Sequence, residues 1–153
     1  MHFAPAVLLA SIAAPLGACW ARWHEFRVLS KGSPLTRELQ QWAEEQGVRH
    51  VERIRLAYAR PIPLPAPMFL RRKLETMGFP TTEIAGLSLR HAIYLDEGTP
   101  LNGAVVRHEL IHTRQYQQSR AMTVFMFRYV YQCLTQGYYD CTLEREARED
   151  SAP

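Results

Sequence analysis

The sequence predicts an α+β fold, in which a small antiparallel or mixed sheet packs against one long helix and a group of C-terminal helices. Two segments, 51–58 and 87–95, have the β-branched and aromatic character of strands. Apolar residues at helical spacing occupy the regions before and between them and nearly all of the chain after residue 99. The order helix, strand, helix, strand and then only helices is typical of α+β domains.

The first 19 residues differ from the rest of the chain. Residues 4–18 carry no charged side chain, and Pro5 and Pro15 interrupt them, so they make a poor membrane-spanning helix. The stretch resembles the apolar region of an export signal, and residues 16–19 resemble a bacterial lipobox. We therefore expect a signal at 1–19, a periplasmic or cell-envelope location, and membrane attachment through the N-terminus.

An alternative stays open because residues 1–3 contain no Lys or Arg, which export signals normally supply. The segment would then be a buried N-terminal helix of a cytoplasmic protein.

The next helix is expected to have Ser33 as its cap and Pro34 in its first position, and to end at Gly47. Its apolar face is formed by Leu35, Leu39 and Trp42. Apolar and polar residues alternate along the segment 51–58, so we expect it to be a strand. One face of that strand is formed by Ile54, Leu56 and Tyr58.

A proline-rich segment, 60–67, can be neither helix nor central strand, so we expect an extended connection there. A short helix is expected at 69–77, ending at Gly78. The segment 87–95 is the clearest strand of the chain.

Three helices are expected after this strand. The first is capped by Thr99 and Pro100 and runs to about Ser119; the others cover 122–135 and 142–149, with Gly137 between them.

The informative motif is His108-Glu109-Leu110-Ile111-His112, within the first of these helices. Residues four apart lie one turn above another, so both imidazoles can bind a single cation. Glu109 points elsewhere on the helix and can act as general base on a water bound to Zn²⁺. The apolar residues around the motif indicate a buried helix, and surface histidines with a salt-bridging glutamate are the alternative.

A catalytic zinc site needs a third protein ligand and an open position. Gln118 stands where metzincins have their third histidine, so a glutamate on a later helix is expected instead. The candidates are Glu144 and Glu146, which point about 200° apart on a helix, so only one can be a ligand.

The charge of the chain argues against one class of function, and its cysteines leave the question of a disulfide open. The net charge is +3, and the longest basic run is the triplet 71–73, so nucleic-acid binding is not expected. Cys133 and Cys141 flank Gly137, and either a disulfide or two buried thiols would fit this spacing.

Several motifs together resemble the gluzincin group of zinc metallopeptidases, especially small bacterial HELxHxxQ proteins of unassigned function. The matching residues are 92–95, 108–112 with Gln115, 137–138 and 144–147. The resemblance covers about residues 47–149. It implies a minimal zincin-like metallohydrolase domain, placed at 33–149, and zinc-dependent hydrolysis of a peptide or protein substrate.

The resemblance also bears on the third ligand. In the CAAX-prenyl protease and heat-shock membrane protease families, the ligand is the first glutamate of E-x-x-A-D. Glu144 has that place here, Ala147 is the alanine, and Arg148 replaces the Asp, which removes the usual support for a ligand histidine.

Two further roles are expected around this site. In zincins an edge strand binds the substrate as an extended peptide, and 87–95 precedes the motif helix and can supply that edge. Tyr138, close to Glu144 in sequence, is the candidate oxyanion donor, although a tyrosine there is more often a packing residue. A non-enzymatic zinc-stabilised envelope binding module is the alternative function.

Overall fold

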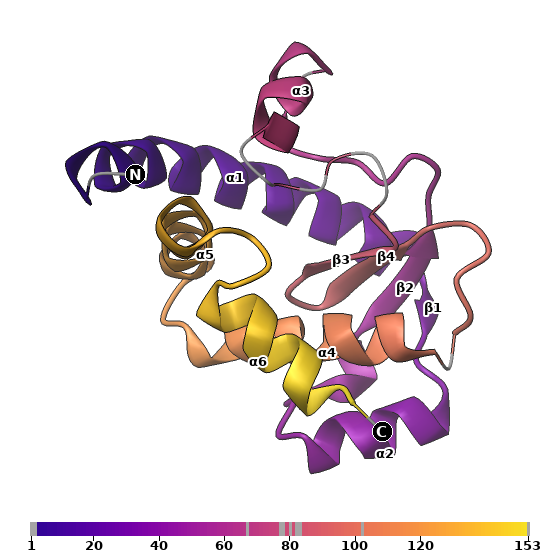
Figure 1. The fold of residues 1–153 in the computed structure, drawn as a ribbon. Helices are drawn as coiled ribbons and strands as arrows, with labels where there is room; N and C mark the ends of the chain where they lie inside the picture. Colours follow the sequence, from indigo (N-terminus) through magenta and orange to yellow (C-terminus); the bar gives the residue numbers. More distant parts are fainter. Residues whose placement is uncertain are drawn as a thin grey trace.

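The computed structural model describes residues 3–66, 68–76, 79, 81, 84–101 and 103–152. Its helices surround a small mixed sheet of four strands, which confirms the α+β prediction (Figure 1). The strand order is β1 (Ser33–Pro34), β2 (Arg55–Tyr58), β4 (Ala92–Leu95) and β3 (Gly86–Leu89). β2 and β4 are parallel, and the other two pairs are antiparallel.

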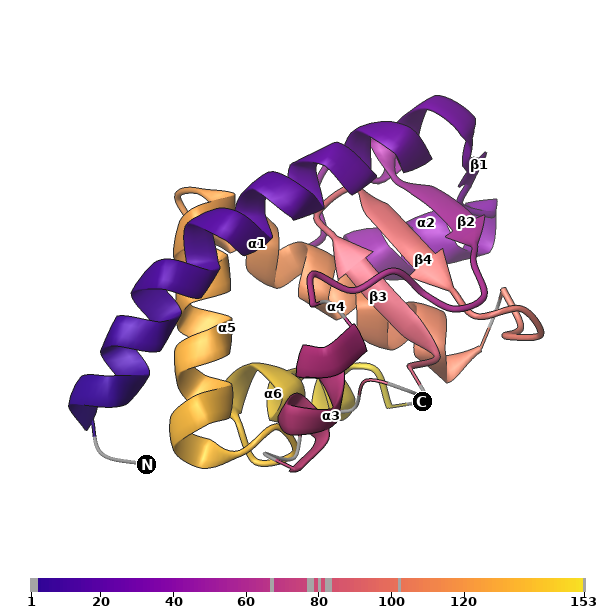
Figure 2. The same cartoon turned by 90° about the horizontal axis from the view of Figure 1, so that it is seen from above.

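Both faces of the sheet are covered by helices, as Figures 1 and 2 show. On β4, Ile93 and Leu95 pack toward α2 (Arg37–Glu45) and α4 (Ala104–Gln118). The alternate residues, Ala92 and Tyr94, pack toward α1 (Phe3–Lys31). This alternation follows from the two-residue period of a strand, and it places α4 along the sheet on the side away from α1.

The strand predicted at 87–95 is wrong as one element, because it folds into the hairpin β3–β4. Arg90 and His91 make the turn, and Arg90 adopts the left-handed conformation with φ 67°. Neither residue is a usual turn former. The turn is instead held by Glu25 of α1, whose carboxylate accepts from the Arg90 guanidinium at 2.9 Å and from the His91 backbone N–H at 3.2 Å.

Replacing Glu25 with glutamine is expected to lower the free energy of unfolding by about 1–3 kcal/mol at neutral pH, because it removes a buried charge partner. Burial alone would raise the pKa of Glu25. Hydrogen bonds from His91 and Arg90 lower it by more than burial raises it, so its folded pKa lies below the ordinary 4.5. This stabilisation is present above the unfolded pKa and is lost as the pH falls through the folded value. Urea unfolding at neutral and acid pH measures it.

The difference in unfolding free energy between wild type and Glu25→Gln should therefore become smaller at acid pH, where Glu25 is protonated. Glu52→Gln, at an exposed position, is the control and should unfold like wild type. Equal unfolding free energies of Glu25→Gln and wild type at neutral pH would contradict the assignment.

Two helix starts differ from their predicted positions. The cap of α2 is Thr36, whose hydroxyl accepts from Leu39 N–H, whereas Ser33 and Pro34 pair with β2 as β1. The long helix α4 begins at Ala104 after Gly103, since Thr99 and the carbonyl of Pro100 take part in turns that precede it. The caps of α2 and α4 therefore lie three and four residues later than the sequence pattern indicated.

The remaining elements are close to prediction. The strand at 51–58 is shorter, because residues 51–53 form a 3₁₀ turn before β2. The connection 60–66 is neither helix nor strand, and α3 (Met68–Thr76) follows; residues 67, 77 and 78 lie outside the described part. The two last helices are α5 (Met122–Gln136) and α6 (Thr142–Asp150), separated at Gly137, whose φ is 87°.

The N-terminal segment is one continuous helix that passes through Pro15, so the expectation of an interrupted stretch is wrong. Its first half packs along α5, and its second half lies on the sheet (Figure 2). This tertiary packing stabilises a helix that sequence propensity alone disfavours. The predicted boundary at residue 19 falls inside this helix, which is long and apolar enough to cross a membrane. Export and lipid anchoring stay predictions.

Candidate metal centre

Helix α4 brings His108 and His112 together as the motif predicts. Their Nε2 atoms lie 3.1 Å apart, and the two rings are nearly perpendicular, with centroids at 4.7 Å. His112 is buried and His108 is partly exposed. Both ring nitrogens therefore point at one position beside α4.

Helix α6 supplies the third group, Glu144. Its Oε2 lies 3.3 Å from Nε2 of His108, and its Oε1 lies 3.3 Å from Nε2 of His112. Glu146 points elsewhere and accepts from Arg114 and from Gln115. Of the two glutamates left open by the sequence, Glu144 is thus the one that meets the histidine pair.

The spacing of these donors fits a metal ion. Ligands bound at about 2.0–2.1 Å in a tetrahedral site lie about 3.3 Å from one another. In this cluster the two imidazole nitrogens are 3.1 Å apart, and each of them lies 3.3 Å from a different oxygen of Glu144. Two imidazole nitrogens and one carboxylate oxygen are also a donor set that Zn²⁺ prefers, and three protein ligands leave one position open.

Gln115 orients one of the histidines. Its Nε2 donates to the carbonyl of Leu143 at 2.9 Å and to Glu146 at 3.0 Å, which fixes the direction of the amide. Its Oε1 must then accept from Nδ1 of His112, at 2.8 Å. The proton is therefore on Nδ1, and the Nε2 lone pair is available to a cation. Gln115 thus provides the hydrogen bond that orients a ligand histidine. Arg148 does not provide it, since its guanidinium donates to the carbonyl of Tyr139.

Tyr129 of α5 is the functional residue that the sequence analysis missed. Its hydroxyl donates to Oε1 of Glu144 at 2.6 Å, and its ring lies edge-on to His112. Burial and the charge of Glu144 raise the pKa of Tyr129 well above its usual range, so the hydroxyl stays protonated. The signal that could have found it is helical spacing, because Tyr129 lies between buried Phe125 and Cys133 on one face and alone there carries a hydroxyl.

Replacing Tyr129 with phenylalanine is expected to weaken zinc binding about 10- to 100-fold, since groups that hold a ligand carboxylate contribute this much to metal affinity. Competition with a zinc-sensitive dye measures the affinity. Tyr139→Phe, on an exposed ring next to the same turn, is the matched control. An unchanged affinity in Tyr129→Phe would show that the hydrogen bond has no part in holding Glu144.

Glu109 lies on the same helix, against strand β3 and not among the three donors. It is 6% exposed, and the backbone N–H of Ser88 donates to its carboxylate. A Cβ on Gly86 would stand 2.7 Å from Cγ of Glu109, so only glycine leaves this carboxylate its space. Burial raises the pKa of Glu109, as expected of a group that exchanges protons near neutral pH.

A proton and a metal ion would compete for this cluster. Burial lowers the pKa of His112, but the hydrogen bond to Glu144 and the charge of Glu144 raise it to about 9. The pKa of Glu144 is lowered by hydrogen bonds from His108 and His112 despite its burial. Because the carboxylate of Glu144 favours the protonated imidazole, a metal ion bound at Nε2 of His112 would have to displace a proton.

Other predicted residues lie close to the cluster. Burial raises the pKa of Tyr138, and the charges of Glu144 and Glu109 raise it further, so its hydroxyl is within electrostatic reach of both carboxylates. Its role as oxyanion donor stays a prediction. Cys133 and Cys141 are buried free thiols with sulfur atoms 3.7 Å apart. The disulfide that the sequence left open is not formed in this structure.

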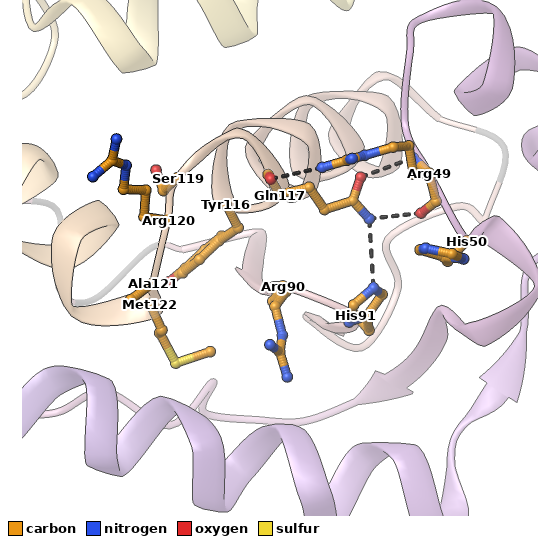
Figure 3. Close-up of a pocket in the computed structure, with 10 residues that line it drawn as sticks. All are labelled: Arg49, His50, Arg90, His91, Tyr116, Gln117, Ser119, Arg120, Ala121 and Met122. Atoms are coloured by element: carbon orange, nitrogen blue, oxygen red, sulfur yellow. Dashed lines mark hydrogen bonds between the residues drawn. The ribbon is translucent and has the colours of Figure 1, made fainter.

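A hollow of about 240 Å³ lies at the C-terminal end of α4, away from the cluster (Figure 3). Its lining includes Arg49, Arg90 and Arg120, but Figure 3 shows these side chains pointing apart. Arg49 donates to the carbonyl of Gln117, and Arg90 is paired with Glu25. Because these two cations already have partners, the hollow is not a converging charged site and adds nothing to the metal centre.

No protein-family model, curated protein or solved structure matches this chain.

Proposed function

We propose that this protein is a zinc-dependent peptide hydrolase. The observation that carries the proposal is the convergence of His108, His112 and Glu144, whose donor atoms lie within 4.8 Å of one another, with Glu109 on the same helix but outside the donor set. A purely structural zinc site has no use for a buried carboxylate of raised pKa beside it.

The roles of the residues follow from their positions. His108, His112 and Glu144 would hold the ion, which when bound would lower the pKa of a water ligand to about 7 and polarise a carbonyl group. Glu109 accepts a proton from the attacking water and later donates it to the leaving amine. The low resting pKa of Glu144 keeps this ligand ionised at neutral pH.

Strand β3 supports a peptide substrate. It is the last strand of the sheet, and Asp96 N–H donates to the carbonyl of Ala85 at 3.0 Å. Alternation along the antiparallel pair then turns the backbone groups of Gly86 and Ser88 away from β4, toward the open edge. An extended peptide can pair with this edge through its main chain, next to Glu109.

Replacing Gly86 with alanine is expected to lower kcat/KM by about 10- to 100-fold with little change in zinc content, because the new methyl group displaces the Glu109 carboxylate. Gly17→Ala is the control, since an added Cβ there makes only an ordinary contact, 3.8 Å from the sulfur of Met126. Steady-state kinetics with zinc analysis separates the two effects. Full activity in Gly86→Ala would remove Glu109 from the position proposed for it.

The function is tested with unstructured peptides and purified protein. Hydrolysis should stop when zinc is removed by a chelator, and stoichiometric zinc should restore it. Cleavage that survives complete zinc removal would overturn the proposal, as would zinc-loaded protein that cleaves no member of a broad peptide library.

A second candidate, a non-enzymatic zinc-stabilised binding module, has one observation in its favour. Glu109 is 6% exposed, so little of its side chain is open to a substrate. A closed site would bind zinc without access for substrate. Spectra of the cobalt-substituted protein discriminate: a small hydroxamate perturbs them only if a coordination position is open.

A further inference from the structure

The outer side of α1 carries a continuous row of large apolar side chains. Five residues are each 55% to 73% exposed, and we call them the outer stripe: Leu8, Ile12, Leu16, Trp23 and Phe26. Successive members are three, four or seven positions apart, so they lie on one side of the helix. Single exposed apolar residues are ordinary, but an aligned row of this length marks a binding surface.

The opposite side of α1 is fully used by the fold. Ala6, Ala10 and Ala14 are buried on the side of α5, and Val28 is buried on the sheet. Glu25, near the C-terminal end, is tied to the hairpin by its ion pair with Arg90. Figures 1 and 2 show α1 at the margin of the molecule with α5 and the sheet on its inner side. The outer stripe is therefore held outward along the whole helix.

The charges on α1 are arranged for an anionic surface. Residues 4–21 carry none, and the exposed Arg22, Arg27 and Lys31 follow. The only acidic residue of α1 is Glu25, which is buried. The guanidinium of Arg27 lies 4.7 Å from the centre of the Trp23 ring. Tryptophan is enriched at the membrane–water interface and basic side chains bind lipid phosphates, so residues 22–31 suit an anionic membrane surface.

A hollow beside the outer stripe likewise combines apolar residues with a basic one. Its volume is about 430 Å³, and it is lined by Pro15, Ala18, Cys19 and Arg22 of α1 and by residues 121–123 at the start of α5. Apolar walls with one guanidinium suit an acyl chain attached to an anionic headgroup.

We propose that the outer stripe is a membrane-binding surface: α1 lies flat at an anionic bilayer, with its five apolar side chains inserted among the lipids and Arg22, Arg27 and Lys31 at the phosphates. The orientation follows from packing, because the stripe runs along the helix while protein covers the other side. Only an axis parallel to the bilayer buries the whole row. The proposal is independent of the metal centre.

A second copy of the chain fits this surface less well. A symmetric contact through the stripe would bring the basic residues of both copies together without an exposed acid on α1 to pair with them. Anionic lipid supplies the missing charge.

The test is flotation of the purified protein with vesicles of phosphatidylcholine, with and without phosphatidylglycerol. Wild type should float with the anionic vesicles, with a blue shift in tryptophan emission. The Ile12→Glu/Leu16→Glu variant should bind about tenfold or more weakly. Leu101→Glu, in an exposed loop far from α1 in sequence, is the control and should bind like wild type. Circular dichroism and zinc content should be the same for all three.

A second variant tests the charge. Arg22→Ser/Arg27→Ser should lose the preference for phosphatidylglycerol and keep the outer stripe. Wild-type protein that stays in solution with both kinds of vesicle would overturn the proposal. So would a stable dimer that the stripe variant dissociates, or bound protein that resists alkaline carbonate extraction, since such resistance indicates a helix that spans the bilayer.

Discussion

Glu109→Gln is expected to lower peptide hydrolysis by about 10²- to 10⁴-fold, which is the usual contribution of a general acid–base. Glutamine has nearly the same shape as glutamate but cannot take a proton from water. It also keeps a group that can bond to the Ser88 N–H, which donates to the glutamate in the wild-type protein. Zinc binding should be unchanged, because Glu109 is not among the three converging donors.

The measurement is kcat and KM on a cleaved peptide, with zinc content determined on the same preparation. Glu149→Gln, at an exposed position on α6, is the matched control and should retain full activity. If the zinc-loaded Glu109→Gln protein cleaved peptide at the wild-type rate, the general-base mechanism would be wrong even though the metal site were real.

Removal of a ligand should have the other large effect. His112→Ala and Glu144→Ala are each expected to abolish stoichiometric zinc binding and, with it, all hydrolysis. In Glu144→Ala two histidines and the hydroxyl of Tyr129 also lose a carboxylate partner inside the protein. We therefore expect the metal-free variant to be less stable than the metal-free wild type by about 3–5 kcal/mol.

Thermal unfolding with and without added zinc checks this. Added zinc should raise the Tm of wild type through binding to the folded state and should leave the Tm of both variants unchanged. Glu149→Ala, on the same helix, should behave as wild type. A zinc-dependent rise in Tm in the Glu144→Ala protein would show that the third ligand lies elsewhere.

The sequence predicted the parts of the site that depend on local geometry. His108 and His112 meet because residues four apart on a helix share a face, and no tertiary knowledge is needed for that. To predict that a glutamate comes back to the histidine pair, it was enough to predict a helix after Gly137. The choice between Glu144 and Glu146 was beyond the residues alone, since it depends on how α6 is rotated against α4. The interaction of Arg114 with Glu146 is part of what sets that rotation.

The missed features all depend on distant contacts. The turn at Arg90 has no local signal, because its stabilising carboxylate is 65 residues away in the chain. The role of Tyr129 depends on a neighbour on another helix. The path of α1 through Pro15 depends on α5, which follows it in the sequence by about a hundred residues. Composition and periodicity indicate the secondary structure that each segment favours by itself. These three features depend instead on tertiary contacts between segments.

The dependence of the β3–β4 turn on Glu25 has a consequence for the order of folding. A hairpin without a favourable turn does not form early by itself, and this one gains its stabilising partner only after α1 has docked. Strand β3 in turn carries Gly86 and Ser88, which define the space around Glu109. We infer that α1 docks on β2 and β4 first, that β3 pairs with β4 next, and that the surroundings of Glu109 are completed last.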